Sequence, residues 1–350
     1  MRKKLIIILF VCLLCWIASV LISFKLFIAL TIVGILGVLL IVLFVIANKL
    51  IKKTNWWRNQ YLSTEQFVSN SGYRDNIIRN YDIVNLGSNP ARFAFFYESV
   101  KGQSWATGSQ GQDMDFEILK YYHSYIKEGG IVVIPIMPFT ALSPYLKQRQ
   151  EYWGVEYYSK FAKILDNAQV QALPNSRKVQ RYLAYPLLYN RRAFRYVIKD
   201  VVIDTKYEIA DQKLMLMDLE QESSFWIEHW IKEFRLGSLS DVFNDKWSQY
   251  YNEAITLNKK IVDFCLERGL KPVFVCIPMT SHLSSRFPST FYKYMVTDFV
   301  KKCNFHNVPF YDYTYDERFK DDGLYLNSFF LNLRGRKFFT EQFLKDLKLI

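Results

Sequence analysis

Residues that commonly build metal sites or disulfide frameworks are scarce in this sequence of 350 residues. Its five cysteines include no C-x-x-C pair, and two of them, Cys12 and Cys15, lie in an apolar N-terminal run. Its four histidines form neither H-x-H nor H-E-x-x-H. Zinc sites, thioredoxin-type motifs and zincin-type proteases depend on such spacings. We therefore expect no metal and no cofactor, and we expect the scattered Cys265, Cys276 and Cys303 to be buried thiols.

Acidic residues are absent before Glu65, although the whole chain has 33 of them against 45 lysines and arginines. Eight of the basic residues lie in this N-terminal stretch, so only +4 of the net charge of +12 belongs to the rest of the chain. Nucleic-acid-binding domains carry their positive charge on the folded surface. The distribution therefore argues against a nucleic acid partner and points to membrane topology and anionic lipid headgroups.

The residues from Leu5 to Asn48 form an apolar run that is broken by one charged residue, Lys25. Residues 5–23 and 26–47 are each long enough to cross a hydrocarbon layer of about 30 Å at about 1.5 Å per residue. A single helix through both would be about twice as long as a bilayer needs. The run therefore predicts a transmembrane hairpin that turns at Phe24-Lys25. The alternative is a signal peptide followed by one anchor, but no small-residue cleavage site follows the first run.

Basic residues lie on both sides of the two apolar spans of this predicted hairpin, which comprises residues 1–50. They are Arg2, Lys3 and Lys4 before the first span and Lys49, Lys52, Lys53 and Arg58 after the second. Because basic flanks stay in the cytoplasm, the charges predict a multi-pass membrane protein whose soluble domain is cytoplasmic. The alternative, an extracytoplasmic domain, stays open because Lys25 in so short a loop can snorkel to either side. In the juxtamembrane connector, residues 51–80, the pair Trp56-Trp57 suits the headgroup region of a lipid bilayer.

Short apolar runs alternate with amphipathic segments after residue 80. Strands are expected at 82–86, 104–107, 131–135, 271–277 and 308–311, and helices at 91–100, 113–127, 249–268, 291–303 and 335–347. Strands separated by helices are typical of parallel sheets with right-handed crossovers. Residues 81–350 are therefore predicted to be an α/β domain, a doubly wound parallel sheet of about five strands with helices on both faces.

Residues 141–245 interrupt this alternation and are rich in Tyr, Arg and Leu. They are expected to form a mostly helical insertion between the third and fourth strands. Two interpretations stay open. The insertion covers a ligand site at the carboxyl ends of the strands, where doubly wound folds bind ligands, or it is a structural flap over the sheet edge or on the membrane.

Three segments resemble the conserved blocks of the SGNH (GDSL-like) hydrolases and acyltransferases. They are Tyr81–Asn89 with its Gly-Ser-Asn end, Gly108–Asp113 at the start of a predicted helix, and Phe329–Gly335 before the last predicted helix. Within that superfamily they are most similar to the membrane-associated branch near polysaccharide O-acetyltransferases and the teichoic-acid D-alanylation protein. The resemblance implies a flavodoxin-like SGNH fold and acyl transfer by a Ser nucleophile, a His base and an orienting Asp.

At the positions that the resemblance assigns to this triad, the chain has Asn89, Asn327 and Phe330. An amide is no alkoxide nucleophile and a phenyl ring carries no proton, so these positions are degenerate. Ser88 is the fallback nucleophile, although neighbouring residues at a strand end point in opposite directions. The ligand cleft is expected to contain Gly87, Ser88, Asn89, Gly108, Ser109, Gln110 and Asn332.

Other polar residues are weaker candidates for chemistry. Asp113, Asp115, Asp321 and Asp322 are candidates for an unconventional acid or base, but helix-dipole and turn roles explain them better. His282 and His306 are expected to be loop or cap residues.

The sequence therefore predicts a membrane-anchored, non-catalytic SGNH-like protein that binds or scaffolds in the assembly or modification of cell-envelope polysaccharide or teichoic acid. Its expected partners are the lipid bilayer, a glycan or acyl ligand, and a membrane-embedded acyltransferase or glycosyltransferase. The alternative is an active O-acyltransferase or esterase that acts on a cell-surface glycan with an unconventional catalytic set.

Overall fold

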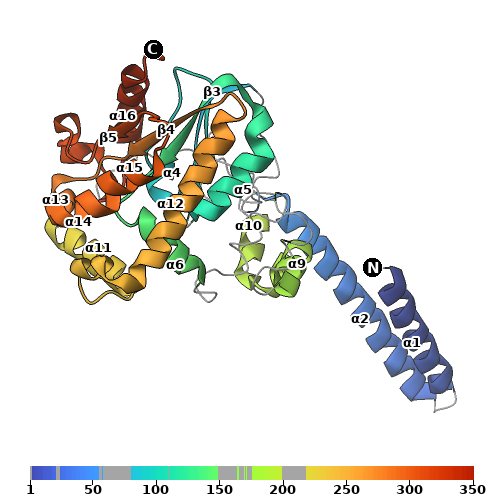
Figure 1. Ribbon diagram of the computed structural model, residues 1–350. Helices are drawn as coiled ribbons and strands as arrows, with labels where there is room; N and C mark the ends of the chain where they lie inside the picture. The colour runs from blue at the N-terminus through green and yellow to red at the C-terminus, as the bar shows by residue number, and fades with distance from the viewer. Residues whose placement is uncertain are drawn as a thin grey trace. The chain divides into compact units, whose positions relative to one another are not determined.

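The structure of the protein is a computed structural model (Figure 1). It describes residues 2–20, 24–54, 57, 80–108, 110–148, 164, 169, 171, 176–198 and 218–350. Residues 1–54 and 181–205 belong to one compact unit, and the remaining residues belong to a second. The connector, apart from Ile51–Thr54, Trp57 and Asn80, and much of the predicted insertion lie outside the described residues.

The first unit contains two N-terminal helices, α1 (Arg2–Val20) and α2 (Phe24–Ile51), which pack against each other. Among the described residues, one helical stretch is long and apolar enough to cross a membrane, Ile28–Ile51; α1 contains a shorter apolar stretch, Ile8–Ile17. The predicted turn at Phe24-Lys25 is wrong, because both residues already belong to the first turn of α2.

Part of the predicted insertion packs on the end of α2. It comprises the end of α9 (Ser176–Ala184), η3 (Pro186–Leu188), η4 (Arg191–Ala193) and α10 (Phe194–Val197). The Leu187 backbone N–H donates to Asn48 Oδ1 at 3.0 Å. The rings of Tyr185 and Phe44 stack with their centroids 5.8 Å apart. This segment is therefore attached to the last turns of α2.

The second unit is built on a five-stranded sheet in which every neighbouring pair of strands is parallel (Figure 1). The strands are β1 (Tyr81–Asn85), β2 (Gly102–Ser104), β3 (Ile126–Pro135), β4 (Lys271–Cys276) and β5 (Phe310–Asp312). Their spatial order is β2-β1-β3-β4-β5. The predicted α/β class and parallel five-stranded sheet are confirmed, and the order is that of a doubly wound sheet whose switch point lies between β1 and β3.

Helices alternate with these strands. The described helices of this unit include α4 (Asn89–Arg92), α5 (Gln112–Tyr122), α6 (Ser143–Gln148), α11 (Leu219–Glu233), α12 (Asp245–Leu266), α13 (Ser281–Ser284), α14 (Ser289–Tyr292), the π-helical η7 (Lys293–Asp298), α15 (Phe299–Cys303) and α16 (Leu333–Asp346). Short 3-10 turns include η1 (His123–Tyr125), η2 (Thr140–Leu142), η6 (Leu239–Phe243), η8 (Glu317–Phe319) and η9 (Asp322–Leu324).

Apolar layers cover both faces of the sheet. On one face, Val133 and Val275 share a buried cluster with Phe339 and Phe343 of α16. The opposite face is covered by α12, which contacts β4, and by α5 and α15, each of which contacts α12. Because both faces are buried, the strands read as continuous apolar runs rather than as alternating ones. Cys265, Cys276 and Cys303 are buried free thiols in these layers.

The predicted boundary between α5 and β3 is wrong. The pair Gly129-Gly130 does not end a helix, because α5 stops at Tyr122 and β3 already begins at Ile126. Gly129 adopts a φ of +68°, a conformation that glycine tolerates, and the pairing of β3 with β1 shifts register at this point. A bulge within the strand therefore explains the glycines. The predicted helix 91–100 is also too long, since α4 ends at Arg92.

Candidate ligand-binding site

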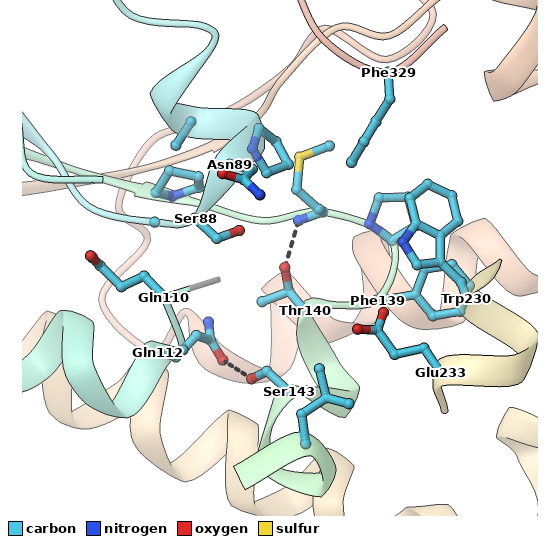
Figure 2. Close-up of a pocket in the computed structure, with 18 of the residues that line it drawn as sticks. Ser88, Asn89, Gln110, Gln112, Phe139, Thr140, Ser143, Trp230, Glu233 and Phe329 are labelled. Carbon is cyan, nitrogen blue, oxygen red and sulfur yellow. Dashed lines mark hydrogen bonds between the residues drawn. The ribbon is translucent and has the colours of Figure 1, made fainter. Parts of the chain in front are cut away.

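A cleft of about 340 Å³ opens at the carboxyl ends of β1 and β3, the switch point of the sheet (Figure 2). The segments that line it include 87–91 after β1, 110–112 at the start of α5, and 137–140 after β3. Chain connections leave β1 and β3 toward opposite sides of such a sheet, which opens a crevice between them. The cleft therefore lies where a doubly wound fold places a ligand.

Gly87 shapes the turn that leads out of β1. Its φ is +109°, and a Cβ built on it would lie 2.9 Å from the Cβ of Ala91 and 3.1 Å from Cγ of Pro135. Only glycine fits this bend without strain. The bend determines the direction of Ser88, whose hydroxyl makes no cap hydrogen bond to α4. Figure 2 shows Ser88 facing the space that Gln110, Gln112 and Thr140 surround, contrary to the predicted outward direction.

Asp115 is a buried carboxylic acid in the wall of the cleft. Its Oδ1 accepts hydrogen bonds from the Gly87 backbone N–H at 2.8 Å and from Gln110 Nε2 at 2.5 Å. Burial raises the pKa of this carboxyl to about 7, because the two hydrogen bonds, which favour the charged form, offset the loss of hydration only in part. Asp115 therefore titrates near neutral pH, as groups at functional sites often do.

Amide and hydroxyl side chains form the polar side of the cleft (Figure 2). Gln112 is fixed from two sides: its Nε2 donates to Asn258 Oδ1 at 3.1 Å, and its Oε1 accepts from Ser143 Oγ at 3.3 Å. Asn89, at the end of the β1 turn, makes no side-chain hydrogen bond to any other described residue. The half-buried Asn89 amide and Ser88 hydroxyl are therefore available to a ligand.

Aromatic rings form the opposite side. Trp226 and Trp230 of α11 lie against Phe329, with ring centroids 5.3 Å and 5.0 Å away. The Phe330 ring stacks on Phe93 at 5.1 Å and meets Trp226 at 5.7 Å. The indole Nε1 of Trp226 is buried and has no hydrogen-bond partner among the described residues. The cleft thus combines one polar and one aromatic wall, which suits a ligand with a polar and an apolar face.

The three predicted triad positions are not all in the cleft. Asn89 and Phe330 line it, whereas Asn327 does not. Asn327 Oδ1 instead accepts the backbone N–H groups of Phe329 and Phe330 at 3.0 Å and 2.8 Å, which stabilises the turn before α16.

Two other predicted cleft residues lie elsewhere. Asn332 is the N-cap of α16, where its Oδ1 accepts from Gly335 N and its Nδ2 donates to the carbonyls of Gly323 and Tyr325. It therefore stabilises the fold and does not line the cleft. Gly108 is buried and also does not line it. Ser109 lies outside the described residues.

Four of the weaker candidates, His282, His306, Asp321 and Asp322, form ion pairs outside the cleft. His282 Nδ1 contacts Glu220 Oε1 at 2.6 Å, and its Nε2 contacts Asp322 Oδ2 at 3.1 Å. His306 pairs with Asp263 at 2.8 Å. Asp321 accepts the Gly323 backbone N–H, as expected of a turn residue.

One histidine of the cleft was not among the residues predicted from the sequence. His229 of α11 lines it, and its Nε2 lies 4.0 Å from Glu233 Oε2. Among the described residues, no histidine forms a hydrogen bond with Ser88. No group of metal-ligating residues occurs in the described part of the chain either.

Comparison of the sequence with models of known protein families and with curated proteins gave no match. The fold and the cleft therefore provide the evidence for function.

Proposed function

We propose that the chain is a membrane-anchored, non-catalytic protein of SGNH-like ancestry, which binds a glycan or acylated ligand during the assembly or modification of cell-envelope polysaccharide or teichoic acid. The observation that carries this proposal is the make-up of the switch-point cleft. Asn89 occupies the position expected of the nucleophile, and Phe330, expected where the base would stand, packs into the aromatic wall. Neither side chain can perform nucleophilic acyl transfer.

The character of the two walls supports a sugar as ligand. Pyranose rings present C–H groups on their faces and hydroxyls around their edges. The indole and phenyl rings of Trp226, Trp230 and Phe329 offer apolar surface to such faces, and the Asn89 amide and the Ser88 hydroxyl offer hydrogen-bond partners to the hydroxyls. A volume of about 340 Å³ is at the lower end of the range for small-molecule sites.

The anchor proposed here is the α1–α2 hairpin, which makes the protein multi-pass. The stretch Ile28–Ile51 supports a spanning α2 by its length and composition. The basic residues at both ends of the hairpin favour a cytoplasmic domain. A cysteine-directed, membrane-impermeant reagent tests the side: a tag with a single cysteine after Ile350 should react only after cell lysis.

An active esterase or O-acyltransferase is the second candidate, and Asp115 is the observation that favours it. Its carboxyl has a pKa of about 7 and binds the backbone N–H of Gly87, directly before Ser88. A carboxylate that titrates near neutral pH is suited to general-base catalysis. In this case Ser88 would be the nucleophile and Asp115 its base.

Two assays on the full-length chain in detergent distinguish these functions. Hydrolysis of p-nitrophenyl acetate should be the same for the wild type, Ser88→Ala and Asp115→Asn, at the rate of the buffer alone. Oligosaccharides with and without O-acetyl groups should quench tryptophan fluorescence, and Trp226→Phe should reduce the change. Hydrolysis that Ser88→Ala abolishes would establish the enzyme instead.

A further inference from the structure

Residues 181–198 of the first unit form an exposed surface that is both basic and apolar. We call these residues the arginine segment. Its four arginines, Arg181, Arg191, Arg192 and Arg195, are all exposed, and none has a carboxylate partner among the described residues. The segment contains no Asp or Glu. Such a surface carries a charge of +4 that no carboxylate of the segment offsets.

Large apolar side chains are exposed between these arginines. Leu188 is 54% exposed, Phe194 46% and Ile198 48%, while Ala193 and Val197 of the same segment are buried. The segment thus has one face that packs inward and another that presents apolar and cationic side chains together. In water this exposure of apolar surface is unfavourable, whereas an interfacial helix satisfies both kinds of side chain at the headgroup level of a bilayer.

The arginine segment is attached to α2 at the height where the lipid headgroups of a bilayer are expected. It is held through Phe44 and Asn48, in the last two turns of the apolar stretch Ile28–Ile51. A stretch of 24 residues is about 36 Å long, slightly more than the hydrocarbon core of a bilayer. Residues held at its C-terminal end therefore lie where the lipid headgroups begin.

We infer that the arginine segment lies in the membrane interface and binds the phosphate groups of anionic phospholipids. The inference rests on the proposed spanning role of α2. Arginine is suited to this role because its guanidinium binds phosphate through two parallel hydrogen bonds. The exposed Leu188, Phe194 and Ile198 enter the boundary between headgroups and acyl chains. A second protein would explain an apolar patch, but the attachment of this patch to the end of a spanning helix favours lipid.

A fluorescent probe on the segment tests its depth. The full-length protein, with Cys12 and Cys15 replaced by serine, receives Leu188→Cys labelled with nitrobenzoxadiazole and is reconstituted into vesicles of phosphatidylcholine with or without phosphatidylglycerol. Shallow doxyl-labelled lipids should quench this probe. The matched control is Phe305→Cys, at a site that is 66% exposed in the second unit, with which the quenching at position 188 is compared.

Charge removal tests the headgroup contact. The triple variant Arg191→Gln, Arg192→Gln, Arg195→Gln should lose quenching mainly in vesicles with phosphatidylglycerol, since each arginine strengthens such contacts by about fivefold. The control removes three exposed positive charges elsewhere, by Lys246→Gln, Lys301→Gln, Lys348→Gln, and should leave quenching unchanged. Equal quenching in both lipids that resists the arginine changes would overturn the phosphate contact.

Extraction with alkaline carbonate distinguishes failure of the proposed membrane anchor from failure of the inference about the arginine segment. If carbonate releases the chain from native membranes, the anchoring by α2 is wrong and the inference fails with it. If the chain resists carbonate but the Leu188 probe is not quenched, anchoring stands and the interfacial position of the arginine segment is refuted.

Discussion

Replacing Asp115 by asparagine should change how the stability of the protein depends on pH. The carboxyl has its pKa raised from 3.8 to about 7 by burial. At about 1.4 kcal/mol for each tenfold change in proton affinity, this difference corresponds to about 4 kcal/mol between the charged and neutral forms, as an upper value. Asparagine has nearly the same shape and keeps an oxygen that can accept from Gly87 and Gln110, but it does not titrate.

The sign of this pH dependence follows from which state of the chain, folded or unfolded, binds the Asp115 proton. Between about pH 4 and pH 7 the folded chain holds the Asp115 proton and the unfolded chain does not, so the free energy of unfolding falls as pH rises. In Asp115→Asn this group does not titrate, so it causes no such fall in the free energy of unfolding. The stability of the variant relative to wild type should therefore rise by up to about 4 kcal/mol from pH 4 to pH 8. The cost of burying the new amide N–H groups, about 1–3 kcal/mol, is independent of pH and shifts all points equally.

Urea unfolding of the full-length protein in detergent, followed by tryptophan fluorescence at several pH values, measures this difference. Asp113→Asn is the matched control, because Asp113 lies in the first turn of the same helix but is only half-buried. The stability difference from wild type should depend steeply on pH for Asp115→Asn only. A difference from wild type that stays constant between pH 4 and pH 8 would refute the assignment of a buried, neutral-pH carboxyl to the cleft.

Three further changes have defined outcomes. Gly335→Ala should lower the stability by more than about 3 kcal/mol and depress Tm sharply, because its Cβ would collide with the backbone carbonyl of Leu324; an unchanged Tm would contradict the close packing of α16. Asn332→Ala should cost about 1–3 kcal/mol in urea unfolding, since it leaves the first turn of α16 uncapped; no loss would show that the cap contributes nothing. The pKa of His282 is raised by the carboxylate of Glu220, so their ion pair stabilises α11 below about pH 6.5 and is lost as pH rises through the raised pKa. His282→Ala should speed hydrogen exchange in α11 at pH 6 but not at pH 9, and an equal effect at both values would exclude a charged pair.

The sheet could be predicted from the sequence because strands that are buried on both faces leave a local signal. Apolar runs such as 131–135 and 272–276 consist of residues that the core accepts, and they form the second half of β3 and nearly all of β4. The start of β3 could not be predicted in the same way. A glycine pair marks the end of a helix as readily as a bulge in a strand, and pairing with β1, which the local sequence does not contain, decides between them.

The polar side of the cleft was accessible to sequence reasoning, but of the aromatic side only Phe330 was predicted. Gly87 and Ser88 belong to a short block at a predicted strand end, where doubly wound folds place ligands. Trp226 and His229 lie on a helix of the insertion whose contacts with the cleft depend on tertiary packing alone. Asp115 was visible as an acidic residue of a first helical turn, but nothing in the local sequence indicates that its carboxyl is buried.

The packing of α16 on the β1 region has a consequence for biosynthesis. The Phe96 backbone N–H donates to Thr340 Oγ1 at 2.8 Å, a contact between residues 244 positions apart. At a synthesis rate of about 5–20 residues per second, the ribosome needs roughly 12 to 50 seconds to make the intervening chain. During this time the apolar surface that α16 later covers is exposed, while the N-terminal segments have already emerged. A chaperone that shields this surface during translation should therefore increase the yield of folded protein, and a stop codon a few residues before α16 should leave a chain that is degraded.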